Sequence, residues 1–422
     1  RLVKLARTFG SFDRPTAIPG GSVAAQSNGP QAVTAILALN ALAGHLGEAG
    51  SAFTLTPPAV DPLLAGTNAS AYSDVQALID RMQNGEVDVL MVQGNPRFEL
   101  PLNSNFVEAA AKVPFVVSFS SEPDETAILA NLILPDHHFL ESWGYQSVAP
   151  ATDRPMISAQ QPVVTPLYDT RATTDVILAL AQAVGGAAAT ALPWPNTVDF
   201  LKAAVAKLAG QDAAFDTANG DTIWAGWRQL GGWWPNAEAP VFPSTAPLLP
   251  PALTITPATY DGNPEQYPLL LYPYPSVTLG DGRGAASSWL QEAPDPMTTA
   301  SWDTWVEINP ETAKGLGIVM DDVVKVISPH GEITAVAYVY PAIRPDVVAV
   351  PLGQGHFEYG RFAKDHGANV AAILAPVTTP DGELAWGATR VRIEKLGRSR
   401  KLPRIENNVG VDAANEYGVF PG

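Results

Sequence analysis

The stretch VDVLMVQGNPRFELP, residues 87–101, decides the fold that the sequence predicts. Its first six residues are apolar except for Asp88, which is typical of a short buried strand, and the turn-forming residues QGNP end that strand. The following residues repeat the pattern, with helices predicted at about 104–112 and 125–131 and strands at 115–119 and 132–134. Strands that alternate with helices at this spacing predict an α/β region with a doubly wound, mostly parallel sheet.

Two apolar segments on either side of this region are predicted to be core helices. Residues 31–47 are rich in Ala and Leu but contain Asn40, and residues 176–192 contain Gln182 and a Gly-Gly pair. Because both segments are short and interrupted, we expect buried helices and no membrane span.

The sequence changes character after about 250 residues. Residues 235–266 are rich in proline and lack periodicity, which predicts a surface connection. The short runs that follow, such as YPLLLYPY, WVEI and EITAVAYVY, predict an antiparallel sandwich or barrel. We therefore predict an α/β region over 1–250, a linker over 251–265, a mainly-β barrel domain over 266–396 and an extended basic tail over 397–422.

The composition excludes several kinds of function. The 25 Lys and Arg residues against 42 Asp and Glu give a formal net charge of -17, which argues against nucleic acid as a partner. The chain has no Cys, so it can hold neither an iron-sulfur cluster nor a thiolate-bound zinc. It begins at Arg1, without Met, and we expect it to be an interior piece of a longer protein.

The charge reverses near the end of the chain. Residues 390–422 contain seven Lys and Arg against four Asp and Glu, and residues 398–404 read RSRKLPR. Opposite charges attract across an interface, so we expect this segment to dock on an acidic neighbouring surface.

His137, His138 and Glu141 have the residue types of a metal site. Adjacent histidines in an extended segment point in opposite directions, however, so only one could easily join Glu141. We therefore favour a hydrogen-bonded polar loop and predict no metal here.

The glycine-rich stretch GQGHFEYGRFAKDHGAN, residues 353–369, is the better candidate site. Glycines allow the backbone to approach a ligand closely, although a tight loop that closes a barrel would use them equally well. The glycines of residues 280–284 resemble a phosphate-binding loop but lack the Lys-Ser/Thr that follows in that motif.

Several segments together resemble the molybdopterin oxidoreductase superfamily. The resemblance is carried by VDVLMVQGNPRFELP, SSEPDETAILANLILPDHHFLESWG, VEINPETAKGLGIVMDDVVKVISPHGEI and VAVPLGQGHFEYGRFAKDHGANVAAIL. It covers nearly the whole chain and implies that the barrel is that family's dinucleotide-binding domain. Residues 289–310 and 389–408 are most similar to the large subunit of alternative complex III, and next to polysulfide and thiosulfate reductase catalytic subunits.

The resemblance also implies which residues border the pterin guanine dinucleotide in catalytic family members. They are Gly94, Asn95, Pro96, Glu125, Thr126, Asp136, His137, Gly353, Gln354, Gly355 and His356. The molybdopterin-like part of alternative complex III has lost its cofactor, so the resemblance implies vestigial loops. We therefore expect no cofactor, no metal and no catalytic residue in this segment.

The implied function is a scaffold within a membrane-associated, quinol-oxidising complex. The implied partners are a ferredoxin-like domain that holds iron-sulfur clusters, c-type cytochrome subunits that hold haem c, and an integral-membrane quinol-binding subunit. The implied location is the extracytoplasmic, periplasmic face of the cytoplasmic membrane. The alternatives are a molybdenum polysulfide or thiosulfate reductase catalytic subunit, with molybdopterin guanine dinucleotide in these loops, and a soluble nucleotide-binding module.

Overall fold

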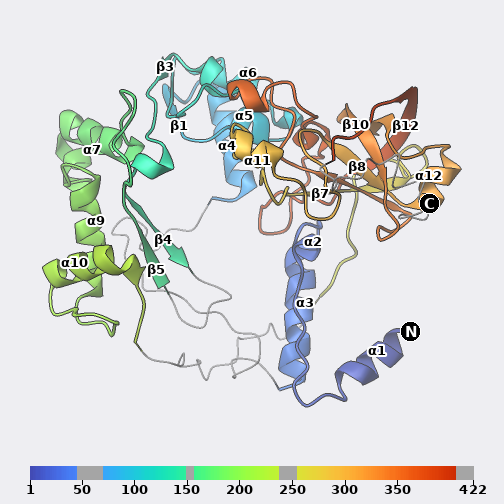
Figure 1. The fold of residues 1–422 in the computed structure, drawn as a ribbon, viewed down its shortest axis with the longest axis horizontal. Coiled ribbons are helices and arrows are strands. Elements are labelled where there is room, and N and C mark those ends of the chain that lie inside the picture. The colour runs from blue at the N-terminus through green and yellow to red at the C-terminus, as the bar shows by residue number, and fades with distance from the viewer. Residues whose placement is uncertain (45–69, 149–155, 237–253, 405–422) are drawn as a thin grey trace. The chain divides into compact units, whose positions relative to one another are not determined.

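The computed structural model describes residues 1–44, 70–148, 156–236 and 254–404, which form two compact units (Figure 1). The first unit consists of Arg1–Pro19, Gln31–Ser70 and Leu134–Thr254, and the second of Gly20–Pro30, Ala71–Ile133 and Ile255–Gly422. The α/β region predicted over 1–250 thus contributes to both units. In the described part of the chain, no helix combines the length and the apolar character needed to cross a membrane.

The second unit contains the predicted parallel sheet, in the order β1-β2-β3. Its strands are β1 (Val89–Val92), β2 (Phe115–Ser118) and β3 (Leu132–Ile133). The register places Val89 opposite Phe115 and Val117 opposite Leu132. The expectation of a mostly parallel α/β sheet is confirmed in this region.

Helices α4 (Tyr72–Gln83) and α6 (Phe106–Ala110) share an apolar core with this sheet. The helix predicted at 125–131 is only a single 3₁₀ turn, η2 (Ala127–Leu129). The side chain of Asp124 accepts hydrogen bonds from the backbone N–H groups of Thr126 and Ala127, at 2.9 and 2.7 Å. These bonds cap the start of the turn. The turn ends at Ala130, whose extended backbone leads into β3.

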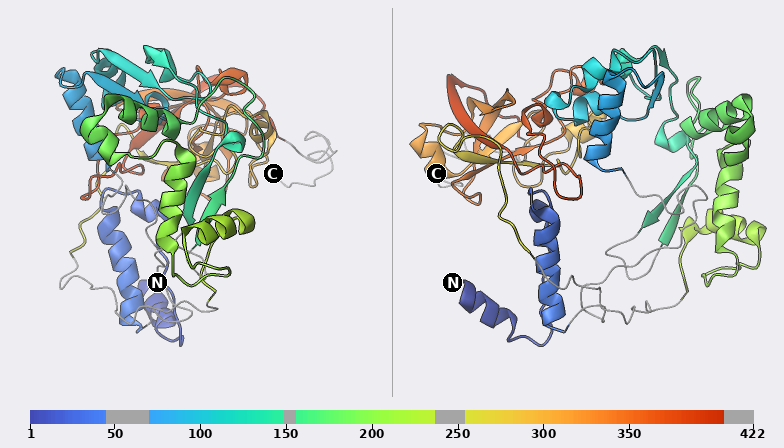
Figure 2. Two further views of the ribbon diagram at one scale, coloured as in Figure 1. Left: turned by 90° about the vertical axis from the view of Figure 1, so that its left-hand side faces the viewer. Right: turned by 180° about the vertical axis from the view of Figure 1, so that it is seen from behind.

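Six strands of the second unit close a barrel in the order β10-β8-β11-β7-β12-β9. They are β7 (Leu269–Tyr274), β8 (Trp305–Ile308), β9 (Asp322–Ser328), β10 (Gly331–Val339), β11 (Val347–Pro351) and β12 (Arg390–Ser399). Figure 2 shows the barrel, in orange and red, from two further sides. The predicted barrel is thus confirmed.

The barrel is mixed, so the expectation of purely antiparallel pairing is wrong. β10 pairs parallel to β8, with Val336 opposite Trp305, and β11 pairs parallel to β7. For β8 and β10 the cause is the intervening strand β9. Because β10 is antiparallel to β9, β10 runs in the direction of β8.

Strand β12 was not predicted as a strand, because most of its side chains are charged or polar. Only Val391 and Ile393 point into the barrel core, between Arg390, Arg392 and Glu394. The strand extends to Ser399, and residues 400–404 then lie on the barrel of the same chain. Within RSRKLPR, Arg400 and Arg404 pair with Asp303 and Asp321 of this barrel, and docking of the segment on an acidic neighbouring surface stays a prediction. Residues 405–422 of the predicted tail lie outside the described residues.

The first unit combines an antiparallel sheet with helices around its own core. The sheet has the order β4-β5-β6, formed by β4 (Gly144–Val148), β5 (Met156–Gln160) and β6 (Gly232–Trp233). Helices α7 (Thr173–Val184), α9 (Thr197–Val205) and α10 (Gly220–Leu230) contribute to that core with Leu178, Leu201 and Trp227. α7 confirms the helix predicted from Val176, and it ends before Gly185, which has a φ of 73°.

The remaining helices are short, apart from α3. They are α1 (Leu2–Phe9), α2 (Gly21–Ala24), α3 (Gly29–Leu42), α5 (Pro96–Glu99), α8 (Gly186–Ala191), α11 (Ser288–Glu292), α12 (Pro310–Gly315) and α13 (Gly360–Ala363). Single 3₁₀ turns lie at η1 (Leu102–Ser104), η3 (Phe139–Glu141), η4 (Ala206–Leu208) and η5 (Val370–Ile373). α3 agrees with the helix predicted from residue 31, whose last residues, 45–47, are not among those described.

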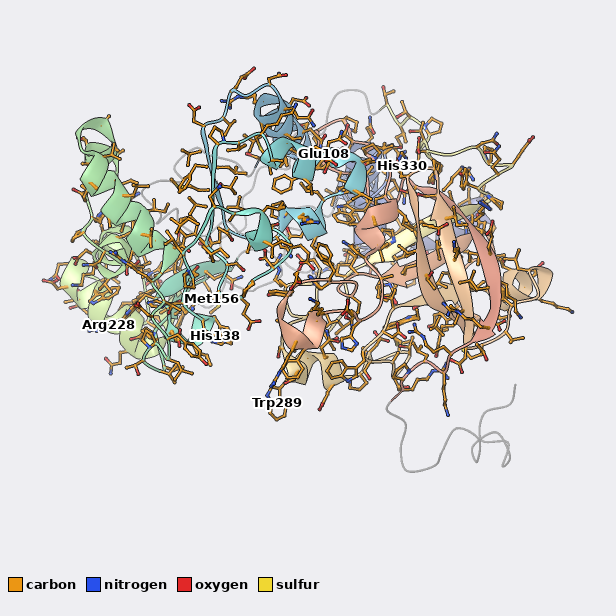
Figure 3. The ribbon with its side chains drawn as sticks, turned by 90° about the horizontal axis from the view of Figure 1, so that it is seen from above. Glu108, His138, Met156, Arg228, Trp289 and His330 are labelled. Atoms are coloured by element: carbon orange, nitrogen blue, oxygen red, sulfur yellow. The ribbon has the colours of Figure 1, made fainter. Side chains whose placement is uncertain are left out.

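A histidine links the parallel-sheet region to the barrel within the second unit. His330, labelled in Figure 3, lies in the turn between β9 and β10. Its Nε2 is 2.7 Å from Asp261 Oδ2, and its Nδ1 is 2.8 Å from Asn103 Nδ2. Since Asn103 belongs to η1, this pair of bonds fixes η1 against the barrel.

A substitution that leaves a cavity in the barrel core should destabilise the fold. Leu271 is almost fully buried inside the barrel, so Leu271→Ala should lower the free energy of unfolding by about 2–5 kcal/mol. The matched control is Val319→Ala, because the Val319 side chain is mostly exposed and its loss should change stability by less than about 0.5 kcal/mol. Urea unfolding measures both, and equal losses would contradict the assignment of Leu271 to the core.

Candidate functional site

The candidate site begins at the loops that leave the carboxyl ends of β1 and β2. In the loop after β1, Asn95 Nδ2 donates a hydrogen bond to Glu125 Oε2 at 2.6 Å. In the loop after β2, Thr126 donates to Asn95 Oδ1 through its hydroxyl at 2.8 Å and through its backbone N–H at 3.1 Å. The predicted loops at Asn95 and Glu125 are therefore joined directly.

The barrel loop after β11 reaches the same carboxylate. The backbone N–H groups of Phe357 and Glu358 donate to Glu125 Oε1 at 2.8 and 3.1 Å. His356 Nδ1 lies 3.1 Å from Oε2 and 3.2 Å from Oε1. Glu125 is fully buried, so a single carboxylate holds three segments that are far apart in the sequence.

The hydrogen bonds determine the charge of Glu125. Burial raises the pKa of its carboxyl, but the bonds from His356, Asn95 and Glu358 outweigh burial and bring the pKa below its ordinary value. The group is therefore a carboxylate, and His356 Nδ1 must carry the proton that it shares with Glu125.

The other side of the His356 ring is enclosed by Phe98 and Gly282. Phe98 stacks on this ring, with 3.6 Å between the ring centroids and an angle of 11°. His356 Nε2 is buried and finds no hydrogen-bond partner among the described residues. At Gly282, a Cβ atom would lie 2.9 Å from this nitrogen and 2.5 Å from the Phe98 ring, so only glycine fits there.

The glycines of the barrel loop are needed for its shape. Gly353 and Gly355 have φ angles of 110° and 98°, which favour glycine. A Cβ atom on Gly355 would lie 1.9 Å from the backbone nitrogen of Asn369. Between the two glycines, Gln354 donates to Gln291 Oε1 at 2.7 Å, and this buried amide pair fixes the loop against α11.

A cavity of about 280 Å³ adjoins the stacked Phe98 ring. Its lining combines aromatic rings with hydrogen-bonding groups: Tyr72, Phe98, Trp386, Glu99, Asp281, Asn369 and Glu383. Burial, and next the carboxylate of Asp281, raises the pKa of Glu99 above its ordinary value. Aromatic faces beside polar groups suit a flat heterocyclic ligand.

The sequence did not point to the residues that complete this site. Phe98, Gln291 and Trp386 carried no recognisable signal, because their roles depend on contacts between distant segments. Asn369 was part of the glycine-rich stretch, and its Nδ2 donates to Phe98 O at 2.7 Å.

Two predicted site residues, Asp136 and His137, belong to the first unit. Asp136 accepts hydrogen bonds from the backbone N–H and the hydroxyl of Thr173, at 3.0 and 2.7 Å, which fixes the start of α7. His137 Nδ1 lies 2.7 Å from the hydroxyl oxygen of Thr170. Their predicted role at a ligand stays a prediction.

Of the residues considered for a metal site, His138 and Glu141 take part in hydrogen bonds within a polar loop. Glu141 accepts hydrogen bonds from the backbone N–H groups of His138, at 3.1 Å, and Leu167, at 2.9 Å. The described residues contain no group of three or more His, Cys, Asp or Glu side chains arranged to hold a metal ion.

Two family models match separate parts of the chain. The model described as "Molybdopterin oxidoreductase" matches residues 7–183, and the model described as "Molydopterin dinucleotide binding domain" matches residues 281–383. The second match covers most of the barrel, including the glycine-rich loop.

Individual relatives agree with these matches. The chain is 29% identical over 404 residues to the menaquinone reductase, molybdopterin-binding-like subunit of Nitratidesulfovibrio vulgaris, covering 93% of this chain and 55% of the relative. It is 26% identical over 241 residues to a tetrathionate reductase chain of Archaeoglobus fulgidus, covering 54% and 19%. The chain thus spans about half the length, or less, of these relatives.

A solved structure supports the fold. The acetylene hydratase from Pelobacter acetylenicus matches with a TM-score of 0.53 and 18% identity, over 76% of this chain and 46% of that chain.

The expectation that this segment binds no cofactor is wrong. The matches of residues 7–183 and 281–383 point to a molybdopterin cofactor site within this chain. The residues present fit such a group, because His356 Nε2 is buried without a hydrogen-bond partner among the described residues, and Phe98, which stacks on the His356 ring, lines an aromatic and polar cavity. The expectation rested on the resemblance to alternative complex III, whose molybdopterin-like part has lost its cofactor, and the family matches overturn it.

The lowered pKa of Glu125 predicts how stability depends on pH. A carboxyl with a lowered pKa in the folded state stabilises the fold above its unfolded pKa of about 4.5, and this contribution is lost as the pH falls through the folded pKa. In Glu125→Gln the thermal midpoint should be lower at pH 7, and its decline between about pH 5 and 3 should be shallower. Parallel curves for both proteins would contradict the prediction.

Because the backbone at Gly355 lies so close to Asn369, a side chain at position 355 should destabilise the fold. Gly355→Ala should lower the free energy of unfolding by more than about 1 kcal/mol, because the added Cβ meets Asn369 and the φ angle disfavours alanine. Gly315→Ala is the control, since open space surrounds Gly315 at the end of α12, and its stability should be unchanged or slightly higher. Thermal unfolding of both variants tests this difference.

Proposed function

We propose that this chain is the pterin-binding portion of a quinone-linked electron-transfer subunit of the molybdopterin oxidoreductase family. The proposal is supported by the family matches over residues 7–183 and 281–383. The carrying observation is the Glu125–His356 pair, which leaves the buried Nε2 without a partner among the described residues, on a ring that stacks on Phe98 of the aromatic cavity. The printed name of the menaquinone reductase relative supports the link to a quinone.

The residues of the second unit have distinct roles in this proposal. When bound, the pterin supplies the two-electron chemistry of the metal that it carries. Glu125 and Asn95 hold the loops in place, and His356 offers its free Nε2 as a hydrogen-bonding group. Phe98 and Trp386 supply faces for stacking, and Gly355 lets the loop backbone run close to Asn369.

The remaining electron carriers must lie elsewhere, since the chain has no Cys to hold an iron-sulfur cluster. We propose a complex arranged like alternative complex III, which oxidises quinol at the extracytoplasmic face of the membrane, except that this chain keeps the pterin that the molybdopterin-like part of alternative complex III has lost. Its partners for this chain are a ferredoxin-like domain with the clusters, c-type cytochrome subunits, and an integral-membrane quinol-binding subunit.

A second candidate function is the catalytic subunit of a reductase for oxidised sulfur compounds, such as polysulfide or thiosulfate. The match to the tetrathionate reductase chain favours it. In this alternative, too, the loops at Asn95, Glu125 and His356 border the pterin.

The pterin content of the purified native complex tests the cofactor site. Released pterin is measured by fluorescence after oxidation, and the wild-type complex should contain it. His356→Gln should retain about tenfold less, because one buried hydrogen bond of about 1.4 kcal/mol is lost. The control is His138→Gln, which changes an exposed histidine of the first unit. A native complex without pterin, or equal contents in both variants, would contradict the cofactor site.

Substrate assays separate the two candidate functions. The quinone-linked proposal predicts oxidation of a menaquinol analogue by the purified complex, with ferricytochrome c as the acceptor. The alternative predicts reduction of polysulfide or thiosulfate by a viologen donor. A complex that contains pterin but reduces only the sulfur compounds would refute the quinone-linked proposal.

A further inference from the structure

The end of the described chain is held firmly on the barrel. Leu402 is fully buried and shares a core with Ala300, Trp305 and Val336. Its backbone N–H donates to Asp321 Oδ1 at 3.2 Å. We call residues 398–404 the strap.

Charged groups reinforce the strap. Arg400 Nη2 lies 2.7 Å from Asp303 Oδ2, and Arg404 Nη2 lies 2.8 Å from Asp321 Oδ1. The guanidinium of Arg404 also lies 5.4 Å from the centre of the Tyr338 ring. Both acidic partners belong to the barrel, so strap and barrel are complementary in charge.

One short segment, residues 300–304, contacts the strap along its length. Ala300 pairs with Arg404 in an antiparallel bridge, and Ser301 N donates to Pro403 O at 3.1 Å. Asp303 binds Arg400, as described above. We call residues 300–304 the bridge segment.

The other side of the bridge segment contacts the glycine-rich loop. Ala368 N donates to Thr304 Oγ1 at 3.0 Å, and the ring of Trp302 lies 5.1 Å from that of His366. His366 O accepts a hydrogen bond from Gly355 N at 2.7 Å. Gly355 is adjacent to His356, so the contacts run without a gap from the strap to the candidate site.

Unusual backbone angles concentrate along this path. Among the described residues, five that are not glycine have a positive φ, and four of them lie here: Thr299, Trp302, Asp321 and Asp365, at 59°, 62°, 68° and 65°. Such angles persist only where surrounding contacts impose them. A cavity of about 20 Å³, lined by Trp302, Asp303 and Gln354 among others, leaves room there for about one water molecule.

We propose that the strap controls the glycine-rich loop through the bridge segment, so that docking of residues 398–404 holds His356 and its loop ready for the ligand. The inference rests on the proposed function for the identity of that ligand, a pterin dinucleotide. By thermodynamic linkage, the ligand in turn stabilises the docked strap.

Hydrogen exchange of the purified native complex tests the coupling. Leu402→Ala removes the buried anchor of the strap, and the matched control is Leu396→Ala, because Leu396 is an exposed leucine on β12, the strand that leads into the strap. We expect Leu402→Ala to increase exchange at least about tenfold at the backbone N–H groups of Gly355 and Ala368, and Leu396→Ala to leave both unchanged. Faster exchange confined to residues 398–404 would overturn the proposal.

A second variant tests the coupling at the contact between the bridge segment and the glycine-rich loop, in case Leu402→Ala does not fold. Thr304→Val removes the oxygen that accepts the bond from Ala368, and Thr304→Ser restores it. The valine variant should speed exchange at the N–H of Leu402, and the serine variant should not. Unchanged exchange at Leu402 in the valine variant would count against the coupling.

The two proposals can fail separately. A wild-type complex without pterin refutes the proposed function, whatever the exchange rates are. When the wild type contains pterin, removal of the pterin should speed exchange in the strap, and a strap that does not respond refutes the coupling alone.

Discussion

The second unit depends on one buried carboxylate that must be paired. An isolated carboxylate costs several kcal/mol to remove from water, so Glu125 requires all of its hydrogen-bond donors. Those donors come from the loop after β1 and from the barrel loop after β11. The buried carboxylate of Glu125 needs protein donors in place of water, and its side-chain partners are Asn95 and His356. This need therefore fixes the parallel-sheet loops next to the barrel loop.

This constraint connects the fold to the chemistry. The hydrogen bond between His356 and the Glu125 carboxylate also orients the His356 ring, so the ring presents Nε2 toward Gly282 and stacks on Phe98. The same loop is held from its other end by Thr304, in the segment that also binds the strap. A single rigid loop thus lies between the candidate ligand and the end of the described chain.

Electrostatics explains why the tail folds back. The chain carries a net charge of -17, and Arg400 and Arg404 pair with the acidic side chains Asp303 and Asp321 of their own barrel. Leu402 adds an apolar anchor that a charge pattern does not reveal, because its burial depends on Trp305 and Val336. The basic segment is therefore an integral part of the barrel unit.

The sequence by itself determined the parallel sheet and the barrel and indicated the loops at Asn95 and His356, because apolar periodicity and the placement of turn residues and glycines are local properties. Glu125 was indicated only by the family resemblance. The tertiary structure decided the parallel pairs of the barrel, the strand β12 and the pairing of Glu125 with His356. It also decided the roles of Phe98 and Gln291. These features arise between residues far apart along the chain, and burial gives them their energy, so no local pattern could reveal them.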